Sequence, residues 1–208
     1  MFNEKKIIIA GDQHIGSYGD CFGRVKHFFS TVEADLLLLG GDLFDLYVMP
    51  PKEDLFKYIQ QNKNIKKWAY IVGNHDKDIN KYFPDLPTYS EYWINDDIVV
   101  THGHQWDQLL GTWDKFFVRH QYFIENAFNV NLQKFFRRAF KPIVKYALRN
   151  LKIKAKETYP NKLVICGHSH LPEESPPYYN WGCQCDGIFS YISITVIDKS
   201  YNIKLIKE

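Results

Sequence analysis

The sequence is poor in cysteine and contains no long apolar run. Its four cysteines, Cys21, Cys166, Cys183 and Cys185, include no Cys-x-x-Cys pair, the spacing that is typical of structural zinc sites. No stretch approaches the roughly 18 uninterrupted apolar residues of a membrane-spanning helix, and the apolar run Ile7–Ala10 is far too short for the core of a signal peptide. These absences favour a cytoplasmic protein with reduced thiols.

An excess of one charge sign is also missing. The chain has 26 Lys and Arg against 24 Asp and Glu, a formal net charge of +2, so total charge alone indicates no nucleic-acid partner. Hydrophobic residues make up 45% of the 208 residues, which is enough to fill the core of an ordinary globular domain. We therefore expect residues 1–208 to form a single domain.

Short apolar runs that stop at Gly, Asp, Asn or His recur along the chain. They are Lys6–Ala10, Leu36–Leu39, Trp68–Val72, Ile98–Thr101 and Leu163–Cys166. Runs of this length, rich in Ile, Val and Leu, indicate buried strands. Between the early runs, apolar residues recur at helical spacing, as from Phe22 to Val32 and from Leu55 to Ile59. This order of strands and helices predicts an α/β fold.

Two segments depart from the alternation. At the carboxyl end, Ile188–Ile197 and Ile203–Ile206 predict a β-hairpin with a turn over Asp198–Asn202. Earlier, residues from about 111 to 156 are rich in aromatic side chains and contain no strand-like run, and Pro142 predicts a kink or a helix restart. We interpret this segment as a helical insertion.

The insertion carries a strongly basic strip. From Leu132 to Lys156 there is no acidic residue, and the basic residues are Lys134, Arg137, Arg138, Lys141, Lys145, Arg149, Lys152, Lys154 and Lys156. A basic amphipathic helix is typical of a surface for anionic lipid or another polyanion. The alternative is the solvated outer face of a helix that packs through its aromatic side chains.

Five polar motifs follow the predicted strands. They are Asp12-Gln13-His14, Gly41-Asp42-Leu43-Phe44-Asp45, Gly73-Asn74-His75-Asp76, His102-Gly103-His104 and Gly167-His168-Ser169-His170. Ligands of open α/β sheets bind beyond the carboxyl ends of the strands, so the motifs should converge on one rim. Their donors suit Mn²⁺, Fe or Zn²⁺ better than Ca²⁺. Two such ions about 3.5–4 Å apart can clamp both oxygens of a phosphoryl displacement. Solvated turns are the alternative, but all five turns carry metal donors.

The order of these motifs resembles the calcineurin-like metallophosphoesterase superfamily, and the resemblance spans Asp12 to His170. It implies a sandwich of two mixed β-sheets flanked by helices, with a metal-bridging hydroxide attacking phosphorus. It implies two divalent ions, with Mn²⁺ first and Fe or Zn²⁺ as alternatives. One ion would be bound by Asp12, His14, Asp42 and His170. The other would be bound by Asp42, Asn74, His102 and His168, so that Asp42 bridges the pair.

The same resemblance implies roles for residues beside the metals. His75 would protonate the leaving oxygen or stabilise charge on the phosphate, and Asp45 would orient His75. Asp76 is expected in a turn or supporting role. In the His-Gly-His motif the family pattern places the metal ligand at His102, so His104 would touch substrate or hydrogen-bond at the rim.

Within the superfamily, the layout is similar to the bacterial UDP-2,3-diacylglucosamine pyrophosphohydrolases. The similar features are Gly41-Asp42-Leu43-Phe44-Asp45-Leu46, the block from His102 to Asp107, and a helical insertion before residues 167–170. In that branch the insertion covers acyl chains. This favours a lipid-linked or nucleotide pyrophosphate as substrate, with peripheral membrane contact through the insertion. The candidate substrate-binding residues there are Arg137, Arg138 and Lys141.

Other substrates stay open. Some members of that branch have Arg where this chain has His75, so phosphomonoesters, diesters and other pyrophosphates are alternatives. Residues 12–16 and 41–45 also resemble the nuclease branch of the superfamily, so a nuclease or cyclic-nucleotide phosphodiesterase, with nucleic acid meeting the basic strip, is a second hypothesis. A third is a non-catalytic metal-binding scaffold.

Overall fold

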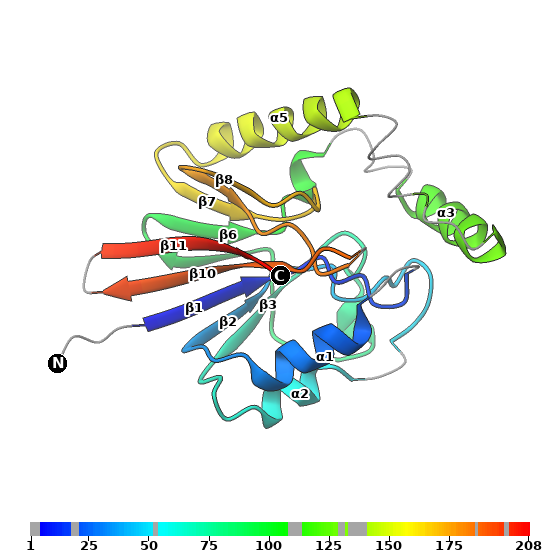
Figure 1. The fold of residues 1–208 in the computed structure, drawn as a ribbon, viewed down its shortest axis with the longest axis horizontal. Helices are drawn as coiled ribbons and strands as arrows, with labels where there is room; N and C mark the ends of the chain where they lie inside the picture. Colours follow the sequence, from blue (N-terminus) through cyan, green and yellow to red (C-terminus); the bar gives the residue numbers. More distant parts are fainter. Residues whose placement is uncertain are drawn as a thin grey trace.

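The computed structural model describes residues 5–17, 21–51, 54–107, 114–128, 132, 141–185, 187–197 and 200–208. These residues form two mixed β-sheets packed against each other, with helices on the outside (Figure 1). The α/β architecture with two mixed sheets and flanking helices is therefore confirmed. Among the described residues, no helix combines the length and the apolar character that crossing a bilayer requires.

The first sheet has six strands. Their order is β11 (Ser200–Lys207), β10 (Ser190–Ile197), β1 (Lys5–Ala10), β2 (Leu36–Leu39), β3 (Trp68–Ile71) and β4 (Thr88–Tyr89). Strands β1 to β4 are parallel, and β10 and β11 join them as an antiparallel hairpin. The second sheet has the order β5 (Glu91–Asn95), β6 (Ile98–Thr101), β7 (Leu163–Cys166), β9 (Tyr178–Asn180) and β8 (Glu173–Ser175), with β6, β7 and β9 parallel.

The uninterrupted apolar runs arise because the central strands are buried on both faces. Successive side chains of a strand point to opposite faces. Leu37 and Leu39 of β2 therefore join the core beneath the outer helices, whereas Leu38 joins the core between the sheets. The same division separates Ile8 from Ile9 in β1.

Helices cover the outer face of each sheet. Helices α1 (Phe22–Thr31) and α2 (Phe56–Gln61) pack on the first sheet through buried side chains such as Phe29 and Ile59. Helix α5 (Lys141–Thr158) packs on the second sheet through Leu151 and Ala155. Two short 3₁₀ helices, η1 (Ile79–Lys81) and η2 (His104–Trp106), lie in the loops after β3 and β6.

The predicted insertion contains two described helices, α3 (Asp114–Phe128) and α5. Pro142 lies in the first turn of α5, where a missing backbone N–H costs no helical hydrogen bond. Leu151 of α5 is buried, while Phe136 and Phe140 of the predicted insertion lie outside the described residues. The strip residues Arg137 and Arg138 also lie outside them, and the side chain of Lys141 is not described.

The carboxyl-terminal hairpin is present, but its first strand begins two residues later than predicted, at Ser190, and its second strand is longer than predicted. β11 begins at Ser200 and ends at Lys207, so three residues assigned to the turn, Ser200 to Asn202, belong to the strand. These residues are exposed, and backbone pairing with β10 orders them without any apolar pattern.

Candidate metal centre

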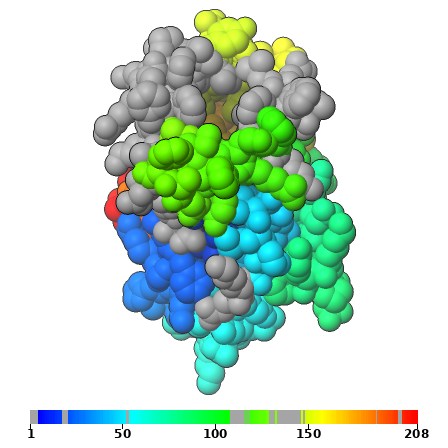
Figure 2. All heavy atoms as spheres, turned by 90° about the vertical axis from the view of Figure 1, so that its right-hand side faces the viewer, coloured from blue at the N-terminus to red at the C-terminus, as the bar shows by residue number. Residues whose placement is uncertain are grey.

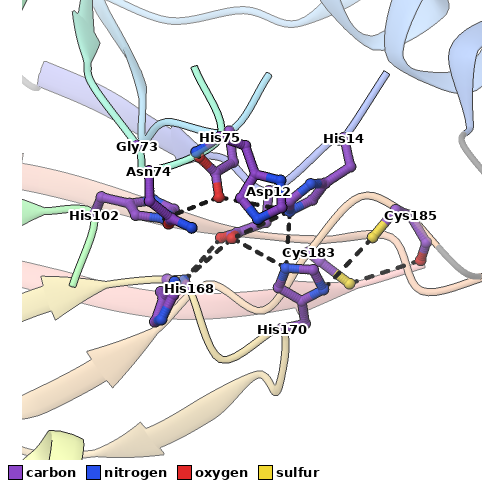
Figure 3. Close-up of polar contacts among 12 residues, drawn as sticks. Asp12, His14, Gly73, Asn74, His75, His102, His168, His170, Cys183 and Cys185 are labelled. Atoms are coloured by element: carbon purple, nitrogen blue, oxygen red, sulfur yellow. Dashed lines mark hydrogen bonds and ion pairs between the residues drawn. The ribbon is translucent and has the colours of Figure 1, made fainter. Parts of the chain in front are cut away.

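The five polar motifs meet at one rim of the sandwich, where parallel strands of both sheets end (Figure 3). Asp12 and His14 follow β1, Asp42 and Asp45 follow β2, Asn74 and His75 follow β3, His102 follows β6, and His168 and His170 follow β7. The distance of 2.9 Å between Nε2 of His14 and Nε2 of His170 shows that donors from the two sheets come into contact. The expected convergence on one rim is therefore present.

A first group of donors surrounds His14. Its Nε2 lies 3.9 Å from Oδ1 of Asp12 and 3.7 Å from Oδ2 of Asp42. Nε2 of His170 lies 3.3 Å from the same Oδ1 of Asp12. All four residues are at most 7% exposed, so their donor atoms face one another rather than solvent.

A second group surrounds His102. Its Nε2 lies 3.2 Å from Oδ2 of Asp42 and 3.1 Å from Oδ1 of Asn74. His168 offers a further donor within 4.8 Å of those of Asp42 and His102. The same oxygen of Asp42 thus faces both groups.

The spacing of the donors fits shared divalent ions. Ligands about 2.0–2.2 Å from one ion, at the angles of tetrahedral or octahedral coordination, lie about 3–3.5 Å apart. Four separations fall close to that range: His14–His170, His170–Asp12, His102–Asp42 and His102–Asn74. The residues present therefore fit two ions with Asp42 between them.

The backbone at this rim adopts a conformation that L-residues rarely take. Asp12, His14, Asp42, His168 and His170 have φ between 48 and 65°, and Asn161 is the one other non-glycine residue with positive φ in the described part of the chain. Such conformations cost on the order of 1–3 kcal/mol each and concentrate at functional sites. These backbone conformations therefore lower the stability of the fold, but they direct the side chains of the five residues inward.

Two glycines make room for the carboxylates. A Cβ on Gly73 would overlap Oδ1 of Asp42 and come within 2.6 Å of its backbone nitrogen. A Cβ on Gly167 would overlap Oδ2 of Asp12 and the ring of Trp181. The glycines of these motifs are therefore required by close approach and not only by turn formation.

Several supporting residues were not predicted from the sequence. Trp181 donates from Nε1 to Oδ2 of Asp12 at 2.7 Å, and Asp107 accepts from Nε2 of His168 at 3.0 Å. Neither belongs to one of the five motifs, although Asp107 closes the block that begins at His102.

A backbone oxygen fixes the tautomer of His102. Its Nδ1 lies 2.9 Å from the carbonyl oxygen of Gly40, so Nδ1 carries the proton and Nε2 is left as a donor to an ion.

His75 and Asp45 lie together beside the first group. Nδ1 of His75 is 3.2 Å from Oδ1 of Asp45, and the His75 backbone N–H donates to Oδ1 of Asp42 at 2.9 Å. The His75 ring packs against Tyr47, with centroids 4.8 Å apart. Oδ2 of Asp45 also lies 3.9 Å from Nδ1 of His14, so Asp45 faces two histidines. The donors of His14, Asp42 and His75 are themselves close enough to share an ion.

Charge within the rim shifts several pKa values. Burial opposes ionisation of Asp42, but the positive charges of His102 and His75 outweigh it and lower the Asp42 pKa well below its usual range. Burial likewise opposes protonation of His102, yet Asp42 and Asp12 raise the His102 pKa to about 9. The same balance lowers the pKa of Asp12. The carboxylates are thus ionised and attract cations.

Asp76 and His104 lie at the margin of the centre. Asp76 is buried and accepts hydrogen bonds from the Leu43 N–H at 2.8 Å, the Gly73 N–H at 2.9 Å and the Tyr70 hydroxyl, which agrees with a supporting role. Burial and the charge of Asp42 raise its pKa to about 6. Burial and then the charge of His102 lower the pKa of His104 to about 4, and Nδ1 of His104 has no partner among the described residues. Among the described residues, His104 belongs to none of the groups of side chains that could bind a metal ion.

Comparisons with known proteins identify a family and several solved structures to which this chain is similar. The family model described as calcineurin-like phosphoesterase matches residues 5–185. Vacuolar protein sorting 29 from Cryptosporidium parvum is 16% identical, with a TM-score of 0.47 over 99% of this chain and 98% of that one. A Thermotoga maritima protein solved by NMR is 17% identical, with a TM-score of 0.45 over 98% and 99%.

A further solved structure with a similar chain is Vps29 from Entamoeba histolytica complexed with Zn²⁺. It is 13% identical, with a TM-score of 0.43 over 97% of this chain and 98% of that chain. A comparison with curated protein sequences gives no match.

Proposed function

Because the chain belongs to the calcineurin-like phosphoesterase family, we propose that it is a hydrolase that uses two divalent metal ions to break a phosphate ester or phosphoanhydride bond. The observation that carries this proposal is the pair of buried donor groups that share Oδ2 of Asp42. A carboxylate oxygen placed between two sets of imidazole donors is the arrangement that a bridged pair of cations requires.

The residues divide naturally between the two ions. Asp12, His14, Asp42 and His170 would bind one ion, and Asp42, Asn74, His102 and His168 the other. When bound, such ions supply positive charge to the phosphoryl oxygens and lower the pKa of water. Mixed nitrogen and oxygen donors favour Mn²⁺, Fe or Zn²⁺.

We assign His75 to the phosphate and not to an ion. Asp45 accepts from Nδ1, so the opposite ring nitrogen, Nε2, would be the one that donates to a substrate. A protonated His75 can donate from Nε2 to the leaving oxygen or to a charged phosphoryl oxygen. Asp45 stabilises that protonated form and orients the ring.

Features of the insertion support a substrate with an apolar part, such as a lipid-linked pyrophosphate. Phe116, Phe123 and Phe128 on α3 are more than half exposed, with 72% exposure at Phe123 and Phe128. Figure 2 shows α3 lying across the face above the atoms around residue 50. Nε of Arg119 donates to the backbone oxygen of Tyr47 at 2.7 Å, and Tyr47 packs on His75. The aromatic helix is thereby linked to the proposed proton donor.

A turnover panel tests this assignment. Metal-stripped protein reconstituted with Mn²⁺ would be assayed on an aryl monoester, an aryl diester, a lipid-linked nucleotide-sugar pyrophosphate, a cyclic nucleotide and single-stranded DNA. We expect the lipid-linked pyrophosphate to give the highest kcat/KM. Preference for single-stranded DNA or for the cyclic nucleotide would assign the protein to the nuclease or phosphodiesterase alternative. Metal binding without turnover of any of these substrates would favour the third hypothesis, a non-catalytic metal-binding scaffold.

Asp42→Ala provides the sharpest test of the two-ion arrangement. Because one oxygen of Asp42 faces both donor groups, we expect this variant to lose both ions and nearly all turnover. Metal content would be measured by mass spectrometry of the intact protein. Asp85→Ala, at an exposed position of a surface loop, is the matched control and should keep both ions. Substantial turnover in Asp42→Ala would contradict the proposal.

A further inference from the structure

Two cysteines lie behind His170, on the side of its ring that faces away from the carboxylates (Figure 3). Nε2 of His170 faces His14 and Asp12, whereas Nδ1 lies 3.8 Å from Sγ of Cys185. The ligand atoms of His170, Cys183 and Cys185 all lie within 4.8 Å of one another, and all three residues are buried. One histidine ring therefore separates two different sets of metal donors.

The loop that carries both thiols is held in place by backbone hydrogen bonds. The Gln184 N–H donates to the Asp12 oxygen at 3.1 Å, the Ser190 N–H to the Cys183 oxygen at 3.0 Å, and the Ile188 N–H to the Cys185 oxygen at 2.9 Å. The sulfur atoms of both cysteines lie within 4.8 Å of a ring nitrogen of His170, so both thiols face that ring. Gln184 instead bonds through its side chain to Gln13 at 3.1 Å. The thiols are thus preorganised.

Cys183 and Cys185 are buried but lie apart from the apolar clusters of the core. A buried cysteine usually behaves as a small apolar side chain, as Cys166 does among Trp106, Val164 and Tyr178. Neither Cys183 nor Cys185 belongs to any of the three apolar clusters formed by the described residues. Their thiols lie instead beside an imidazole and backbone oxygen, including the Cys185 oxygen at 3.7 Å from Sγ of Cys183.

We propose that Cys183, Cys185 and Nδ1 of His170 form a binding site for a thiophilic cation of the Zn²⁺, Cd²⁺ or Cu⁺ type, separate from the dinuclear centre. Metal–sulfur bonds of about 2.3 Å and metal–nitrogen bonds of about 2.0–2.1 Å place neighbouring tetrahedral ligands about 3.5–4 Å apart. The separation of 3.8 Å between Cys185 Sγ and His170 Nδ1 matches that value. Thiolate sulfur selects soft cations, unlike the oxygen-rich rim.

Binding at this site has a defined proton balance. Two metal–sulfur bonds and one metal–nitrogen bond form, while the thiols, and Nδ1 where it is protonated, release their protons to solvent. The cation offsets the charge of two buried thiolates. Because the His170 ring lies in both donor sets, occupancy behind the ring should alter the affinity of the Asp12 group for its own ion. The site itself does not depend on the proposed phosphohydrolase activity.

A Cd²⁺ titration of the reduced, metal-stripped protein tests the proposal. We expect ultraviolet thiolate-to-cadmium charge-transfer absorption that saturates at one thiolate-bound ion per chain. The absorption should disappear in the double variant Cys183→Ser with Cys185→Ser and persist in Cys21→Ser, whose thiol lies at the start of α1. An absorption that survives in the double variant, or is missing from the unaltered protein, would overturn the site.

A second test is X-ray absorption spectroscopy of the unaltered protein at saturating Zn²⁺, which does not depend on whether a cysteine variant folds. We expect a shell of sulfur scatterers at about 2.3 Å in addition to nitrogen and oxygen at about 2.0–2.2 Å. A spectrum fitted by nitrogen and oxygen alone would refute the thiolate site. Turnover with Mn²⁺ is a separate measurement that does not require the thiolate site. Failure of the thiolate site is therefore distinguishable from failure of the proposed function.

Discussion

At the scale of single residues, the rim histidines differ in what faces Nδ1. Six of the eight histidines of the chain lie at the rim. Nδ1 of His102 faces a backbone oxygen, that of His75 faces Asp45, and that of His170 faces a thiol. The Gly40 carbonyl keeps a proton on Nδ1 of His102 and directs Nε2 toward the metal donors, whereas Asp45 orients the ring of His75. In the proposed function, His102 is a metal ligand and His75 is the proton donor.

We therefore expect His75→Ala to keep both ions and lose rate. Loss of a positioned proton donor lowers kcat by about 10²–10⁴-fold, and the loss should be smaller for an aryl ester whose leaving group needs no proton. Steady-state kinetics and metal analysis of the same samples check this. His27→Ala, at an exposed position of α1, is the control. A drop in metal content of His75→Ala would instead place His75 among the ligands, in the group it can form with His14 and Asp42.

The motif residues could be predicted because each motif keeps its donors next to a strand end in the sequence. Trp181 and Asp107 could not, because their contacts join residues 169 and 61 positions apart. The thiol pair was missed for a related reason. Cys183 and Cys185 are spaced Cys-x-Cys and not Cys-x-x-Cys. The third donor of their group, His170, comes from a different loop.

At the scale of elements, the functional parts are the turns that follow the strands. The turns after β1, β2 and β7 place donors in the left-handed region, and neighbouring turns come within contact distance, as Gly73 lies against Asp42. The apolar runs of β1, β2, β3, β6 and β7 were predicted because burial on both faces requires continuous Ile, Val and Leu. Strands β4, β8 and β9 have only two or three residues, too few for any periodicity.

Gly73→Ala tests how tightly the turns are packed. Its new Cβ would collide with Asp42, so the β2 and β3 turns must separate. We expect a loss of about 1–3 kcal/mol in the free energy of unfolding, which corresponds to roughly 2–4 °C in Tm for each kcal/mol, together with weaker metal binding. Thermal unfolding with and without Mn²⁺ measures both effects.

Gly23→Ala is the matched control for this change. Gly23 lies in α1, where an added Cβ meets nothing within 4 Å, and alanine is the better helix former by up to about 1 kcal/mol. The control should therefore unfold at the same temperature or higher. Equal metal affinity in Gly73→Ala and the unaltered protein would show that the rim tolerates movement of Asp42.

At the scale of the whole molecule, the metal centre and the insertion lie on neighbouring surfaces. The sandwich directs its parallel strand ends to one rim, α5 covers the second sheet, and α3 is linked to the rim through Arg119 (Figure 1). The sequence predicted helices in this segment and their basic strip. Which side chains of the strip face the rim could not be predicted, because helical spacing gives relative but not absolute orientation.

The basic strip leads to a prediction about substrate presentation. Replacing Arg137, Arg138 and Lys141 together with Gln removes three positive charges from a surface proposed to meet anionic lipid. Each basic residue near an anionic membrane contributes about 1 kcal/mol of binding, so binding to vesicles containing anionic lipid should weaken on the order of 100-fold. Turnover of a lipid-linked substrate in those vesicles should fall accordingly. Turnover of a soluble aryl phosphodiester should not change, since it requires only the rim.

A matched variant separates this effect from the loss of net charge. Lys63, Lys67 and Lys204 are exposed and lie outside the insertion, and changing these three to Gln removes the same charge from elsewhere. That variant should bind vesicles like the unaltered protein, and the difference between the two variants should shrink as salt rises, because exposed charges are screened within about 10 Å at 0.1 M salt. Equal losses on vesicle-bound and soluble substrates would show that the strip supports the fold rather than a lipid surface.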